Sequence, residues 1–172
     1  GISRIIAFNT QIAASQPFCA GDNASKSAYS DGWQNGDNDG TGFNAWALSN
    51  SGSAGFFISS AASNGDGDSN SDGDINTFGI AWGTYANGGG TANAVRPFAA
   101  DLTTGQTFVL SMDNGYLDNG ASVGFGLQNS SGNNVFEFYY RGGDAVNSYK
   151  RNDNAGEQNI GLGFTDEGLA IS

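Results

Sequence analysis

Short segments in which apolar and polar residues alternate recur along this chain, and they are the feature that most limits its fold. In residues 122–128 (SVGFGLQ), Val123, Phe125 and Leu127 alternate with small or polar residues. Successive side chains of a β-strand point to opposite faces, so a period of two predicts a strand with one buried face. Helical periodicity is nearly absent. The chain is therefore expected to be all-β.

The predicted strands are short, and clusters of Gly, Asn, Asp and Ser, which favour turns, separate them. They cover residues 2–8, 43–48, 55–59, 75–85, 94–98, 107–112, 122–128, 135–141, 148–151 and 160–164. Further side chains expected in the core are Phe136, Phe138, Tyr140, Phe108, Leu110 and Met112. Residues 114–120 and 129–134 are predicted turns between neighbouring antiparallel strands. Many short strands of this kind are typical of a sandwich or barrel, and we predict a two-sheet antiparallel β-sandwich.

The net charge of the chain limits the classes of partner that it is expected to bind. Six Lys and Arg against seventeen Asp and Glu give a net charge of −11. The few basic residues form no patch that could neutralise several phosphates, which argues against nucleic acid. No apolar run is long enough to span a bilayer, so membrane insertion is not expected. Strong acidity suits solubility outside the cell or the binding of divalent cations.

The single cysteine and the absent histidine bear on location and chemistry. Cys19 cannot form a disulfide within the chain, and the sequence starts with Gly1, as a mature, processed chain would. We therefore expect an extracellular or cell-surface protein. The absence of histidine removes the Ser–His and Cys–His pairs of nucleophilic catalysis. A glycosidase needs only two carboxylates, but Glu137 stands alone on its predicted strand. We expect no enzyme.

One acidic loop has the spacing of a cation site. Residues 68–76 (DSNSDGDIN) place oxygen-bearing side chains at alternate positions, followed by a glycine and an apolar residue. Such a loop can wrap a hard cation, because the glycine allows a sharp turn and Ile75 anchors the loop to the core. The alternative interpretation is a solvated acidic turn. We favour calcium, because concentrating mutually repelling carboxylates requires a reason.

This loop resembles the first nine positions of an EF-hand or dockerin calcium loop. The resemblance implies side-chain ligands from Asp68, Asn70 and Asp72, a backbone carbonyl from Asp74, and Asn76 as a ligand directly or through water. The twelfth position is Gly79, where those families carry a bidentate acid. Asp66 is the candidate substitute for that acid.

A wider resemblance covers residues 29–169. The stretches that carry it include 31–34 (DGWQ), 81–87 (AWGTYAN), 94–98 (AVRPF), 123–132 (VGFGLQNSSG) and 136–139 (FEFY). They resemble bacterial extracellular jelly-roll domains of the concanavalin A-like or laminin-G-like type. The resemblance implies a jelly-roll sandwich, with a surface-exposed or sugar-binding role and no catalytic residues to carry over.

The N-terminal segment suggests how copies could be joined. Residues 1–28 are interpreted as a strand with a long polar connection, and residues 29–172 as the jelly-roll domain. The apolar residues of this first strand are Ile2, Ile5, Ile6, Phe8 and Ile12. A detachable strand can pair with an open sheet edge of a neighbour, which predicts a structural or adhesive homopolymer, or assembly with other surface proteins. The alternative is the first strand of a self-contained sandwich.

A second functional hypothesis is a lectin-like, carbohydrate-binding module with a polysaccharide as its partner. Aromatic faces can stack on sugar rings, and polar side chains beside them can fix the sugar hydroxyls. The candidate ligand-binding residues are Trp46, Trp82, Tyr85, Glu137, Tyr139 and Arg141. The alternative for most of these rings is packing in the core.

Overall fold

The computed structural model describes residues 2–4, 19–59, 80–165 and 167–172. In these ranges the chain is all-β apart from one 3-10 turn. The elements are β1 (Ile2–Arg4), η1 (Ser27–Tyr29), β2 (Ala47–Ser59), β3 (Ala81–Val95), β4 (Leu110–Met112), β5 (Ser122–Gln128), β6 (Asn134–Arg141), β7 (Lys150–Asp153), β8 (Gly156–Asn159) and β9 (Leu169–Ile171). The part of the chain that the structure describes holds no helix with the length and apolarity needed to cross a membrane.

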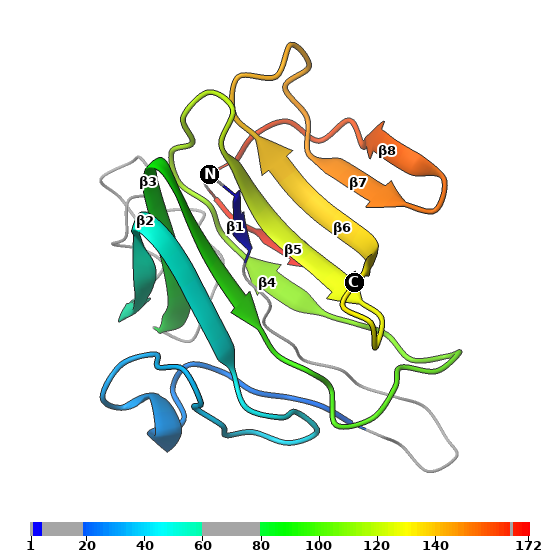
Figure 1. The fold of residues 1–172 in the computed structure, drawn as a ribbon. Coiled ribbons are helices and arrows are strands. Elements are labelled where there is room, and N and C mark those ends of the chain that lie inside the picture. Colours follow the sequence, from blue (N-terminus) through cyan, green and yellow to red (C-terminus); the bar gives the residue numbers. More distant parts are fainter. Residues whose placement is uncertain (1, 5–18, 60–79, 166) are drawn as a thin grey trace.

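Seven of the strands form one sheet, in the order β2-β3-β1-β5-β6-β7-β8 (Figure 1). The β2–β3, β5–β6, β6–β7 and β7–β8 pairs are antiparallel, whereas β1 runs parallel to both of its neighbours. A second, two-stranded sheet consists of the antiparallel pair β4–β9.

The core cluster contains side chains from both sheets. Leu110 and Met112 of β4 are buried in the same cluster as Phe125 of β5 and Phe138 of β6. Phe125 and Phe138 stack with their ring centroids 5.8 Å apart. The alternating side chains of 107–112, 122–128 and 135–141 thus face the core as predicted. Each fully buried side chain of this size contributes about 1.5–3 kcal/mol.

The structure joins predicted strands that the sequence pattern separates. Residues 43–48 and 55–59 were expected as two strands, but β2 is continuous across 47–59 and pairs along its length with β3. Three glycines of β3, residues 88–90, fall between the predicted strands 75–85 and 94–98, where a loop is expected. They form a bulge instead, opposite the register shift between Ser51 and Ser53, with Gly88 and Gly89 at positive φ. Glycine tolerates that backbone conformation, so the strand continues past the bulge.

Two other local predictions differ from the structure, and one is confirmed. Residues 160–164 form no strand; the chain pairs instead at β8, and Ile160 and Leu162 are each 41% exposed. Residues 114–120 connect β4 to β5, which belong to different sheets, and not two neighbouring strands. The turn between β5 and β6 forms as expected, because the Asn129 side chain accepts hydrogen bonds from the backbone N–H groups of Ser131 and Asn133.

A buried arginine fixes the polar connection that precedes β2. Arg96 donates to the Asp22 carboxylate, and the exposed fraction of both side chains is 1%. Its guanidinium also donates to the Asn44 carbonyl at 2.8 Å and lies 5.2 Å from the centroid of the Trp46 ring. Tyr29, which donates to Asp22, is buried as well. Burial raises the pKa of Tyr29 above its usual value, and the hydrogen bond to Asp22 adds to the effect.

This network explains why the polar connection belongs to the folded body. Ala20 and Ala24 lie in the same core cluster as Tyr29, Trp33 and Trp46. Packing is therefore continuous across residue 28, where the sequence interpretation placed the boundary of its first segment.

Candidate functional site

The predicted calcium ligands Asp66, Asp68, Asn70, Asp72, Asp74 and Asn76 lie outside the described residues. The undescribed stretch 60–79 lies in the chain between Ser59, the last residue of β2, and Ile80, which precedes β3. Across the ranges that are described, no group of three or more Asp, Glu or Cys side chains gathers where a metal ion could bind. The calcium hypothesis therefore stays a prediction from the sequence.

The aromatic candidates for sugar stacking lie in different places. Trp46 and Trp82 are 2% and 8% exposed, and their rings pack against each other 5.5 Å apart. Their faces are not available to a ligand, because the core covers them. Tyr85 is 47% exposed on β3. The structure does not bring these three residues together with Glu137, Tyr139 and Arg141, which lie on β6.

The other three predicted ligand-binding residues, Glu137, Tyr139 and Arg141, lie together on β6. Glu137, Tyr139 and Arg141 alternate with Phe136, Phe138 and Tyr140 along β6, so they occupy the face of the sheet opposite the core. The pairing of β6 with β7, and of β7 with β8, places residues of these two strands beside them on the same face. Glu137 pairs with Asn152 and then Glu157, and Tyr139 pairs with Lys150 and then Asn159. The sequence indicated the three β6 residues but not their partners on β7 and β8.

The charges of this face engage one another. Lys150 Nζ lies 2.9 Å from Asp144 Oδ2, 3.3 Å from Glu157 Oε1 and 2.9 Å from Asn159 Oδ1. Tyr139 donates to Glu157, and the Arg141 guanidinium lies 5.4 Å from the centroid of the Tyr139 ring. Asn134 and Asn152 donate to Glu137 at 2.7 and 2.8 Å.

The pKa values follow these contacts. Burial, then the hydrogen bond to Glu157, raises the pKa of Tyr139 to about 12. The hydrogen bond from Tyr139 and the Lys150 ammonium hold the pKa of Glu157 below its usual value. The hydrogen bond to Asp144 raises the pKa of Lys150. Lys150 therefore remains an ammonium and Glu157 a carboxylate at neutral pH. These charged and polar side chains pair with one another and so link β6, β7 and β8.

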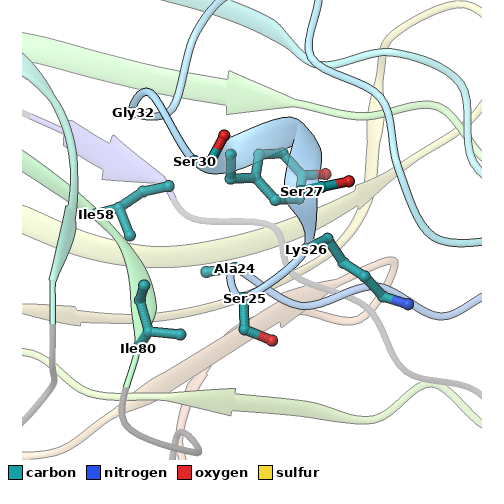
Figure 2. Close-up of a pocket in the computed structure, with 9 residues that line it drawn as sticks. Ala24, Ser25, Lys26, Ser27, Ser30, Gly32, Ile58 and Ile80 are labelled. Carbon is teal, nitrogen blue, oxygen red and sulfur yellow. The ribbon is translucent and has the colours of Figure 1, made fainter.

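One shallow pocket of about 310 Å³ lies beside η1 (Figure 2). Its wall is formed by residues of the segment 24–32, three of them serines, and by two isoleucines, Ile58 of β2 and Ile80, which precedes β3. We assign this pocket no ligand.

The position of β1 is the least ordinary feature of the fold. In Figure 1 the dark-blue β1 lies between the green β3 and the yellow β5, and its described residues are Ile2–Arg4. Ser3 pairs with Ala92 of β3 and Val123 of β5, and Arg4 with Asn93 and Gly124. We call the space between β3 and β5 that β1 fills the β1 slot. Among the described strands, β1 alone hydrogen-bonds the β2–β3 part of the sheet to the β5–β8 part.

Small residues line the β1 slot on both sides. Ala92 and Ala94 of β3 are fully buried. Gly124 of β5 is close to β6: a Cβ added there would lie 2.5 Å from Tyr139 Cα and closer still to the Phe138 carbonyl oxygen. The sequence shows these alanines and glycines, but nothing in it indicates that they border one slot. Of the predicted assembly residues, Ile2 lies in β1, and Ile5, Ile6, Phe8 and Ile12 lie outside the described residues.

Comparisons with models of protein families, with curated proteins and with solved structures gave no match.

Proposed function

We propose that this protein is a non-catalytic structural or adhesive module of an extracellular surface assembly, whose copies are joined by β-strand addition and stabilised by calcium. In this proposal the β4–β9 pair and the large sheet are the two layers of a jelly-roll sandwich. The partners are further copies of the chain or other surface proteins.

The observation that carries this proposal is the placement of β1. β1 completes the middle of the large sheet, and residues 5–18 separate it along the chain from residues 19–46, which the Arg96 network holds to the body. Without a strand between them, the facing edges of β3 and β5 would offer rows of N–H and C=O groups to any strand that can reach them. A strand in such a place is suited to strand addition between molecules.

Loss of the β1 backbone donor is expected to dissolve the assembly. We expect the full chain to form a multi-copy species in light scattering, and the variant Ser3→Pro to run as a single copy, because proline cannot donate to the ladder. Ser3→Ala keeps the N–H and is the matched control, which should assemble like the parent. A far-ultraviolet circular dichroism spectrum of the proline variant checks that it remains folded. An assembly of unchanged size in the folded proline variant, or in a chain lacking residues 1–12, would contradict joining by this strand.

Removal of calcium is expected to lower the thermal unfolding midpoint. The loop 66–76 would supply Asp66, Asp68, Asn70, Asp72, Asp74 and Asn76, and binding to the folded state alone stabilises it in proportion to the logarithm of the ligand concentration. The midpoint is measured with calcium and then with an excess of chelator. Asp68→Asn with Asp72→Asn should make the two midpoints coincide. A parent protein whose midpoint does not respond to calcium would remove the metal from the proposal.

The carbohydrate-binding alternative receives less support from the geometry. Trp46 and Trp82 present no ring face to solvent, and Arg141 lies over the ring of Tyr139. Polysaccharide retained by a single-copy protein would favour this alternative over the assembly.

A further inference from the structure

We propose that the β1 slot of each copy is filled by β1 of a second copy, which runs parallel to both β3 and β5. This inference rests on the proposed function and adds the acceptor, the direction of the strand and its register to it. Ile2 of the donor would pair with Ser122, Ser3 with Ala92 and Val123, and Arg4 with Asn93 and Gly124 of the acceptor.

The direction of β1 supports exchange between copies. Antiparallel strands can be joined by a tight turn, whereas parallel strands require a long connection. The antiparallel β2–β3, β5–β6, β6–β7 and β7–β8 pairs each join strands that are consecutive among the described elements. β1 pairs with β3 and β5, neither of which follows it directly. No tight turn therefore commits β1 to the slot of its own molecule.

The sequence places the 14 residues 5–18 between β1 and Cys19, where the described body resumes. The cost of closing a flexible loop grows only with the logarithm of its length, about 0.6 kcal/mol for each doubling. A β1 that comes from the same chain already bears the closure of a long connection. The same strand from a second copy makes identical backbone hydrogen bonds, and a high local concentration of copies in an assembly offsets the cost of association.

The backbone pairing of the β1 slot favours β1 as the strand that fills it. Without β1, the facing edges of β3 and β5 would each carry unpaired backbone groups in the middle of a sheet, which is costly when they are buried. With β1 in place, Ala92, the partner of Ser3, and the nearby Ala94 are fully buried, so the strand that fills the slot lies in the interior of the sheet. The strand that the structure places in it, in register with β3 and β5, is Ile2–Arg4, and every copy of the chain carries one.

A disulfide between positions 4 and 93 tests the exchange. Paired residues on neighbouring strands lie about 5 Å apart, within the range that a disulfide spans. Arg4→Cys and Asn93→Cys are made separately in a Cys19→Ser background, because Cys19 is the only cysteine. The two proteins are unfolded, mixed, refolded together and oxidised. We expect a covalent two-chain species that joins position 4 of one chain to position 93 of the other, identified by peptide mass spectrometry.

A matched control sets the standard for a pair within one molecule. Ser49 and Asn93 are partners in the β2–β3 hairpin, so the double variant Ser49→Cys, Asn93→Cys should close within a single chain. If the double variant Arg4→Cys, Asn93→Cys also closes only within one chain, and the mixed single variants stay uncoupled, the exchange is wrong. Light scattering of the same mixture distinguishes failure of this inference from failure of the proposed function. Assemblies without the 4–93 disulfide overturn this inference alone, whereas the absence of any assembly overturns the proposed function as well.

Discussion

Replacement of Arg96 by methionine is expected to lower the free energy of unfolding by about 3–5 kcal/mol. The substitution leaves the Asp22 carboxylate buried without its cation and removes the donor to the Asn44 carbonyl. It also removes a cation from over the rings of Phe43 and Trp46. Because this network fixes residues 19–46 to the body, denaturant titration should show a lower midpoint for the whole fold.

An exposed ion pair on the same sheet provides the control for this substitution. Arg151 Nη1 lies 2.8 Å from Asp153 Oδ2, and the Arg151 side chain is 42% exposed. Exposed pairs contribute about 0.2–1 kcal/mol, so Arg151→Met should change the free energy of unfolding by about 1 kcal/mol or less. Equal effects at positions 96 and 151 would show that the Arg96 network does not hold the connection in place.

An added methyl group at Gly124 is expected to destabilise the fold by about 3 kcal/mol and to weaken assembly. The new Cβ would meet the backbone of β6 at Phe138 and Tyr139, which cannot move without separating β5 from β6. Gly124 is also a partner of Arg4, so a displaced β5 disturbs the β1 slot. Denaturant titration gives the stability of Gly124→Ala, and light scattering gives its assembly.

Gly126 is the matched control on the same strand. A Cβ at Gly126 would lie 3.3 Å from the Phe136 carbonyl oxygen, which a small shift can relieve, and Gly126 is not a partner of β1. Gly126→Ala should therefore cost less than about 1 kcal/mol and leave assembly intact. If Gly124→Ala is as stable as Gly126→Ala, the close approach of β5 and β6 at this position is wrong.

The sequence predicted the parts of the fold that depend on local alternation. Residues 122–128 and 135–141 show a clean period of two, and β5 and β6 lie within one residue of these predictions. The glycines at 88–90 misled the prediction, because a bulge and a turn require the same backbone freedom. The parallel pairing of β1 was not predictable, because it depends on strands far away in the chain.

The candidate sites, too, were predictable only where local alternation of residues identifies them. Alternation placed Glu137, Tyr139 and Arg141 on one face of a strand, which was sufficient to find the cluster on β6. Their partners Lys150 and Glu157 depend on strand register, which the sequence does not specify. Trp46 and Trp82 could be surface or core from their type alone, and contacts between distant segments decide that they are core.

Electron microscopy of the purified full chain with calcium tests most directly whether copies of this protein build an assembly. The strand-exchange account predicts continuous objects with a regular repeat, which disappear in Ser3→Pro and persist in Ser3→Ala. Separate particles the size of one 17.6 kDa chain in the unaltered protein, at every concentration, would contradict it.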